Sequence, residues 1–117
     1  WHSRWAAAGP CTIQLFDETE MTVTAIHHVS VIVAETEQSL RFYRDLLGIP
    51  VSEDRPDLGY PGAWLQVGLQ QIHLLELPNP DAISGRPTHA GRDRHLAMTV
   101  SDPDALQREL EAAGIAC

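Results

Sequence analysis

Two segments of the chain repeat one pattern, and this repeat constrains the fold more than any other feature of the sequence. In residues 28–33 and 94–100, every second side chain is apolar, and the positions between them are small or polar except at Ile32. The alternating apolar positions are Val29, Val31 and Val33 in the first segment and Leu96, Met98 and Val100 in the second. Successive side chains of a strand point to opposite faces. The pattern therefore predicts two strands, each with one apolar face and with His28 or His95 on the other face.

Each predicted strand is followed by an amphipathic helix that ends at a glycine. The first helix is expected over residues 35–47 and the second over residues 103–113, with apolar side chains at helical spacing. Gly48 and Gly114 stand where a left-handed C-terminal cap is expected. Asp102 is a suitable N-cap for the second helix. The chain therefore contains the same strand–helix unit twice.

Between the two units, the sequence predicts a β-hairpin with a tight turn at Gly68. Its strands are residues 63–67 and 70–76, and a short edge strand is expected at residues 51–53. A two-residue turn places two pairs directly opposite each other on one face: Trp64 with His73, and Gln66 with Gln71. The element order is then strand, helix and three strands, followed by strand and helix.

This order predicts an α+β fold of βαβββ modules with a curved mixed sheet. We expect module one at residues 21–80, a linker rich in turn-forming residues at 81–92, and a partial module two, with strand and helix only, at 93–117. Residues 1–20 form an N-terminal extension. Residues 11–16 within it could add one strand.

Composition excludes several classes of partner. The formal net charge is −8, and the eight basic residues, all arginine, are scattered along the chain. Nucleic acid and anionic membrane surfaces both require clustered basic residues, so neither is expected as a partner. No apolar run approaches the roughly 20 residues that span a bilayer, and no signal-peptide pattern is present. We therefore expect a cytoplasmic protein. A disulfide between Cys11 and Cys117 is possible, but nothing in the sequence requires it.

Three histidines lie on predicted strands: His28, His73 and His95. Imidazole is a common ligand for Zn, Ni, Fe and Co, and neighbouring strands lie only about 5 Å apart, so the three side chains could meet at one metal ion. The alternative is that each is an ordinary hydrogen-bonded strand histidine. Candidate substrate-binding residues are Trp64 and Gln66 beside His73, and Arg55 and Tyr60 in the preceding loop.

The sequence resembles the vicinal oxygen chelate superfamily, which includes glyoxalase I, methylmalonyl-CoA epimerase, extradiol dioxygenases, and the fosfomycin- and bleomycin-resistance proteins. The resemblance covers residues 21–117, and four motifs carry it: HVSVIV at 28–33, LRFYRDLLG at 40–48, IHLLE at 72–76 and HLAMTV at 95–100. It implies two βαβββ modules whose sheets curl around a divalent metal.

The resemblance also implies a ligand set. His28 and His95 match the first-strand ligands of the two modules, and His73 matches the last-strand ligand of module one. Many relatives take a fourth ligand, a glutamate, from the final strand of module two, and that strand is missing from this sequence. We expect one of three replacements: water or substrate, a second chain in a homodimer, or residues 11–16 of the N-terminal extension, which resemble a terminal family strand with Gln14 where the glutamate would stand.

The resemblance implies a metal-dependent lyase or isomerase that acts on a small substrate with vicinal oxygens, with Zn, Ni, Fe, Mn or Co as the metal. No general base can be named, and Glu76 is a weak candidate. The alternatives are a non-catalytic protein that sequesters an antibiotic, or a truncated relative that depends on assembly. Ring-cleaving dioxygenase activity is disfavoured, because that chemistry typically uses two histidines and one carboxylate.

Overall fold

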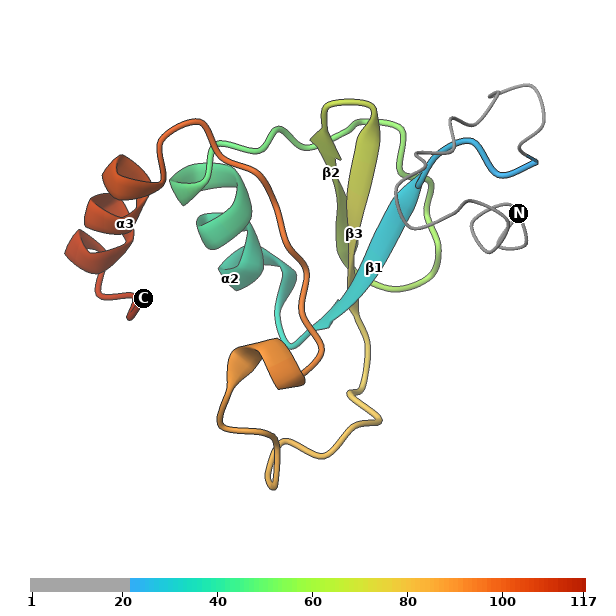
Figure 1. Cartoon of the computed structure of the whole chain (residues 1–117). Helices are drawn as coiled ribbons and strands as arrows, with labels where there is room; N and C mark the ends of the chain where they lie inside the picture. The colour runs from blue at the N-terminus through green and yellow to red at the C-terminus, as the bar shows by residue number, and fades with distance from the viewer. Residues whose placement is uncertain (1–21) are drawn as a thin grey trace, which may run out of the picture.

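The computed structural model describes residues 22–117, and its centre is a three-stranded mixed sheet (Figure 1). The strands are β1 (His28–Val33), β2 (Gly62–Val67) and β3 (Gln70–Glu76), in the order β1-β3-β2. The central strand β3 runs parallel to β1 and antiparallel to β2. The expectations for the N-terminal extension, including its added strand and a disulfide from Cys11, lie outside the described residues.

The register of the hairpin confirms the prediction from the sequence. Trp64 is paired with His73, and Gln66 with Gln71. Gly68 opens the two-residue turn with a φ of 59°, a conformation that glycine adopts without steric cost. The edge strand expected at residues 51–53 is reduced to a single bridge between Val51 and Leu65.

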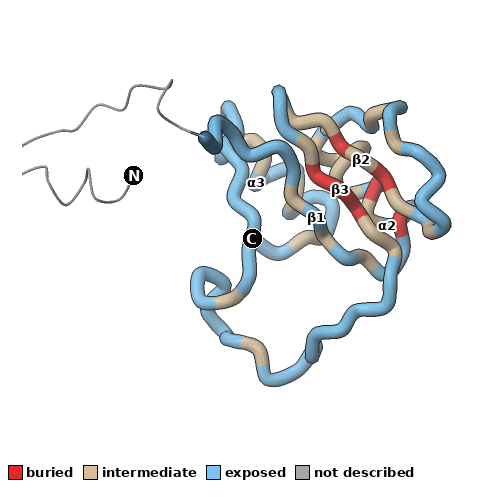
Figure 2. Tube along the Cα trace, turned by 90° about the vertical axis from the view of Figure 1, so that its right-hand side faces the viewer, coloured by how far each residue is buried: buried red, intermediate tan, exposed pale blue. Residues whose placement is uncertain are grey.

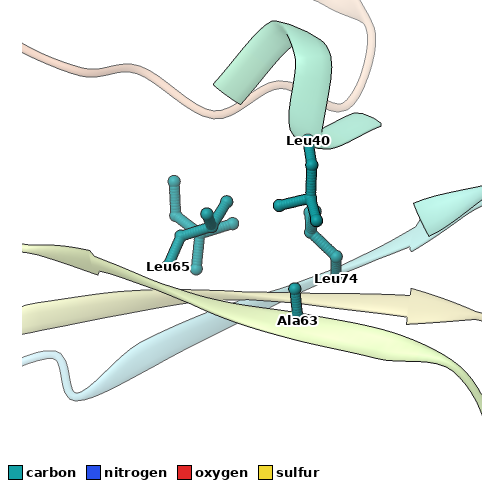
Figure 3. Packing of buried hydrophobic residues seen from close by; sticks show 5 residues of the cluster. Leu40, Ala63, Leu65 and Leu74 are labelled. Carbon is teal, nitrogen blue, oxygen red and sulfur yellow. The ribbon is translucent and has the colours of Figure 1, made fainter. Parts of the chain in front are cut away.

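The apolar side of the sheet packs under a helix and forms the core. Its buried side chains are Leu40, Ala63, Leu65, Ile72 and Leu74. They gather on β2, β3 and the helix, as Figure 2 shows. Leu40 points from the helix onto the sheet above Ala63 and Leu74 (Figure 3). The alternating valines of β1 are half-buried against the same cluster, so the predicted apolar face of this strand is confirmed.

This covering helix consists of α2 (Thr36–Leu40) and a continuation, η2 (Arg41–Leu46), with the wider π-type turn. Together they match the predicted helix, and Gly48 ends it with a φ of 73°. The N-terminus is capped from a distance: the backbone N–H of Thr36 donates to Oε1 of Glu76, at 2.7 Å. Glu35, the residue at the N-cap position, makes no capping bond with its side chain. The end of β3 thus satisfies the start of α2.

The second unit is confirmed in its helix but not in its strand. Helix α3 (Pro103–Ala112) is capped by Asp102, whose Oδ1 accepts a bond from the N–H of Ala105 at 3.0 Å, and Gly114 follows the helix with a φ of 81°. The strand predicted at residues 94–100 is wrong for the described chain. A strand needs a hydrogen-bonded neighbour, and none of β1, β2 and β3 pairs with this segment.

Because segment 94–100 has no paired strand, its apolar side chains Leu96, Met98 and Val100 stay about 40 % exposed. In Figure 1 this segment is the orange connection between the 3₁₀ turn η3 (Ala90–Arg92) and α3. Neither α3 nor any other helix of residues 22–117 has the length and apolarity needed to cross a membrane.

The remote cap of α2 predicts a specific effect on stability. We expect Glu76→Ala to lower the free energy of unfolding by about 1 kcal/mol, because a helix loses its capping acceptor. Urea unfolding followed by circular dichroism measures this loss. Glu35→Ala is the matched control beside the same helix end, and equal losses in both variants would contradict the assignment.

Burial predicts a larger effect at the centre of the core. Leu65 is 0 % exposed and Leu69, in the adjacent turn, is 98 % exposed. We expect Leu65→Ala to cost about 2–5 kcal/mol through lost contacts and a cavity, and Leu69→Ala to change stability by less than about 0.5 kcal/mol. Thermal unfolding of the two variants tests this contrast, and similar melting temperatures would overturn the packing described here.

Candidate functional site

The face of the sheet opposite the core carries four of the seven site residues predicted from the sequence: His28, Trp64, Gln66 and His73. Strand alternation places them there, because their neighbours along each strand point into the core. We call this set the polar face: His28 from β1, Gln71 and His73 from β3, and Trp64 and Gln66 from β2. Of the three histidines predicted to share a site, two therefore lie on adjacent strands of one surface.

Three rings of the polar face form a continuous stack across the sheet. The rings of Trp64 and His73 lie 4.2 Å apart with planes at 5°. The rings of His73 and His28 lie 4.0 Å apart with planes at 12°. His73 is thus covered on both sides and is 8 % exposed. We call these residues the three-ring stack.

His27 extends this arrangement at the start of β1. Its ring meets that of His28 edge to face at 5.1 Å, and the two Nδ1 atoms lie 2.9 Å apart, so one of them donates to the other. His28 itself is exposed at the edge of the sheet. Its ring is therefore held by stacking and by this one bond rather than by surrounding core.

A chain of glutamine side chains connects His73 to the hairpin turn. Nε2 of His73 lies 2.8 Å from Oε1 of Gln71. The Nε2 amide of Gln71 donates to Oε1 of Gln66, at 2.8 Å. That of Gln66 donates to the carbonyl oxygens of Gly68, at 2.8 Å, and Gln70, at 3.3 Å. Gln71 was not predicted as a site residue, although its place opposite Gln66 in the hairpin register was the signal for it.

Burial and neighbouring charges make His73 difficult to protonate. The main cause of its lowered pKa is desolvation, because the imidazolium loses water between the two covering rings. The histidines at 28 and 27, when charged, and the guanidinium of Arg55 lower the pKa of His73 further. His73 is consequently neutral at pH 7, the state in which imidazole binds a metal or accepts a proton.

Arg55 and Tyr60, predicted to contact substrate, contact each other. Nη2 of Arg55 donates to the backbone carbonyl of Tyr60 at 2.7 Å, and its guanidinium carbon lies 5.3 Å from the centre of the Tyr60 ring. The same guanidinium lies against the backbone of β2 at Gly62, where a Cβ would stand 3.0 Å from Nη2. One donor group of Arg55 is therefore engaged in closing its own loop.

His95 lies apart from the stack on the unpaired segment 94–100. Its Nδ1 is 2.9 Å from the carbonyl oxygen of Asp93, and its side chain is exposed. Two ion pairs hold the preceding loop: a bidentate pair between Arg86 and Asp93, and a pair between Arg94 and Asp81. Over residues 22–117, no three His, Cys, Asp or Glu side chains converge in a cluster suited to a metal ion.

The two stacked imidazoles can be compared with what a metal requires. A ligand nitrogen points its lone pair in the plane of its ring, at about 2.0–2.1 Å from zinc. The ring centres of His28 and His73 lie 4.0 Å apart and their planes differ by only 12°, so the two planes do not meet near the rings and cannot both contain one ion there. His28 is exposed and could turn, whereas His73 is fixed between its neighbours. In the arrangement described, the two rings therefore do not direct nitrogens at one point, and joint binding of one ion requires the His28 ring to rotate.

A pocket of about 480 Å³ lies elsewhere, where β1 and β3 end. It is lined by residues 32–34 and 76–79 and by none of the predicted site residues. Glu76, its one titratable group, is engaged as the cap of α2 and was considered above as a weak candidate base. This pocket is therefore no extension of the polar face.

Comparison with known proteins gives these features a context. The chain is 33 % identical over 95 residues to "Glyoxylase I 4" of Arabidopsis thaliana, covering 80 % of this chain and 53 % of the relative. It is 31 % identical over 91 residues to the mitochondrial methylmalonyl-CoA epimerase of Mus musculus, covering 74 % and 51 %. The chain thus spans about half the length of each of these two curated relatives.

A solved structure shows the same fold at much lower identity. The fosfomycin resistance protein FosX of Listeria monocytogenes, solved in complex with Mn(II), superimposes with a TM-score of 0.61 at 14 % identity, over 81 % of this chain and 71 % of that one. The family model described as "Glyoxalase/Bleomycin resistance protein/Dioxygenase superfamily" matches residues 25–117. The match covers the sheet, the helices α2 and α3, and the histidines His28, His73 and His95, and it shows that the chain belongs to this superfamily.

Proposed function

We propose that this chain carries part of the metal site of a lyase or isomerase that acts on a small substrate with vicinal oxygens. The observation that carries the proposal is the contact between His28 and His73, two imidazoles that adjacent parallel strands bring together on the polar face. Imidazole is a typical ligand of first-row divalent metals, and these two rings could share one ion after the exposed His28 ring turns out of the stack. The metal itself, among Zn, Ni, Fe, Mn and Co, is left open by the donor set.

In this proposal His28 and His73 are two ligands and His95 is the third. The bound metal would supply Lewis-acid stabilisation of an oxyanion that develops on the substrate. Trp64 covers His73 and keeps water from one side of its ring. The guanidinium of Arg55 retains donors beyond the one bonded to Tyr60 and would orient an anionic substrate. Glu76 is not proposed as the base, because its carboxylate caps α2.

The position of His95 gives the proposal a structural condition. Segment 94–100 must acquire a neighbouring strand before its histidine side can face a sheet-lined site. Strands from a second copy of the chain, or from further residues of the same protein, would provide that neighbour and would cover Leu96, Met98 and Val100. We therefore propose a homodimer as the assembly in which the site is complete.

The names of the two curated relatives are consistent with this class of reaction, because one is a glyoxalase and the other an epimerase. That this chain acts on a substrate with vicinal oxygens is part of the proposal, because each match covers only about half of the relative.

A second candidate function is binding without catalysis, and one observation favours it. The planes of His28 and His73 are nearly parallel and do not converge on one point, as they would around a metal. A stacked aromatic surface also suits a flat ligand, and the net charge of −8 suits a cationic one, such as a basic antibiotic. In that case ligand binding would be unaffected by chelators.

Metal content distinguishes the two candidates. Protein purified from metal-supplemented cells and then dialysed should hold close to one divalent metal per chain. His28→Ala and His73→Ala should each reduce this content to near zero, because each removes a ligand. Elemental analysis by mass spectrometry is the measurement, and His89→Ala is the control, since His89 lies in the exposed loop before η3. A well-folded protein without metal would contradict the enzymatic proposal and direct attention to drug binding.

The depressed pKa of His73 predicts how stability changes with pH in metal-free protein. The pKa of a histidine in the unfolded chain is about 6.5, and the pKa of folded His73 is lower. The unfolded state therefore takes up the proton first as pH falls. Stability is therefore full above about pH 6.5 and decreases as pH falls toward the folded pKa. Urea unfolding at about pH 8 and about pH 5.5 measures the difference.

The variant His73→Gln should lose this part of the pH dependence, whereas His89→Gln should retain it. A pH dependence in His73→Gln equal to that of the parent protein would show that other groups cause it.

A further inference from the structure

We infer that Gln66 and Gln71 fix the tautomer of His73, with the proton on Nε2 and the free lone pair on Nδ1. The inference concerns the direction of the hydrogen bonds between these side chains. It makes the two glutamines positioning residues for His73. It holds for the metal-free chain and does not depend on the proposed function.

The direction is set at the hairpin turn. The carbonyl oxygens of Gly68 and Gln70 can only accept hydrogen bonds, and both lie within bonding distance of one end of the Gln66 amide, at 2.8 and 3.3 Å. That end must therefore be the NH₂ group. The reverse orientation would bring the amide oxygen against two carbonyl oxygens, with no hydrogen between them.

Fixing Gln66 fixes Gln71 in turn. With its NH₂ group on the turn, Gln66 presents Oε1 to Gln71 at 2.8 Å. An oxygen needs a donor, so the NH₂ group of Gln71 must face Gln66. The Oε1 of Gln71 is then left on the side of His73. Two amides, each of ambiguous orientation when considered alone, become unambiguous when considered in series.

The last bond decides the state of the imidazole. Oε1 of Gln71 is an acceptor 2.8 Å from Nε2 of His73, so Nε2 must donate. A neutral imidazole carries one N–H, which leaves Nδ1 as the unprotonated nitrogen. Of the two ring nitrogens of His73, only Nε2 has a hydrogen-bond partner among residues 22–117. The backbone of the turn is linked to His73 through a series of three hydrogen bonds. It thereby determines which nitrogen of the His73 ring is basic.

This result deepens the proposed function in one respect, and that part rests on the proposal above. If His73 binds a metal while its bond to Gln71 is intact, it binds through Nδ1. The proton on Nε2 would then be shared with an uncharged amide, rather than with a carboxylate that would increase the basicity of the ring.

The test is nitrogen NMR of metal-free protein labelled with ¹⁵N-histidine, at about pH 8.5, where neutral imidazole predominates. Two-bond couplings from the ring carbons' protons identify which nitrogen is protonated, and His73→Gln assigns the signals. The expected pattern for His73 is protonated Nε2 and unprotonated Nδ1. The opposite pattern would overturn the inference.

Variants show whether the glutamines cause this state. Gln71→Leu removes the acceptor and should lower the ratio of the Nε2–H to the Nδ1–H tautomer by about fivefold, the size expected for one neutral hydrogen bond. Gln71→Glu retains an acceptor and should keep the parent tautomer. Gln70→Leu is the matched control, because only the backbone carbonyl of Gln70 takes part. An unchanged ratio in Gln71→Leu would refute the inference.

A second variant covers the case in which Gln71→Leu does not fold. Gln66→Leu leaves the Gln71 amide free to turn, so both tautomers of His73 should become populated. An unchanged ratio in this variant would equally refute the inference. Titration of the same samples with Zn²⁺ is scored separately: failure to bind zinc would count against the proposed function, while the tautomer result would stand.

Discussion

The pairing of β3 with strands on both of its sides is the constraint on which the rest of the structure depends. It places Leu74 in the core and His73 on the opposite face, and it sets Trp64 and His28 on either side of that histidine. A shift of one residue in the register would exchange the two faces, placing imidazole in the apolar core and leucine on the polar face. Core and candidate site are therefore two sides of one hydrogen-bonding pattern and cannot change independently.

Much of this pattern could be predicted because it is local in sequence. Period-two alternation gave the faces of β1, β2 and β3, and the position of Gly68 gave the pairing of Trp64 with His73. Gly48 and Gly114 marked the helix ends, where a left-handed conformation is needed. In each case the physical cause lies within a few residues, so the sequence carries it directly.

Other features could not be predicted because they depend on what a segment meets in space. Residues 94–100 have the alternation of a strand but lack a paired neighbour in the described chain, and alternation alone does not supply one. Glu76 resembled a free carboxylate, yet it bonds a backbone N–H that is 40 residues away. The three histidines were recognised as residue types suited to a metal. Of these, His28 and His73 are in contact and His95 lies elsewhere, which only the path of the chain could reveal.

The bond between Glu76 and Thr36 also has a consequence for the order of folding events. The first turn of α2 lacks a cap from its own residues, so it is completed only when the end of β3 has reached it. Since β3 must pair with both β1 and β2, this helix start waits for contacts that close long loops. The hairpin, whose strands are joined by two residues, faces no such delay. The placement of this single carboxylate therefore favours an order of folding in which the hairpin forms first and the start of α2 forms last.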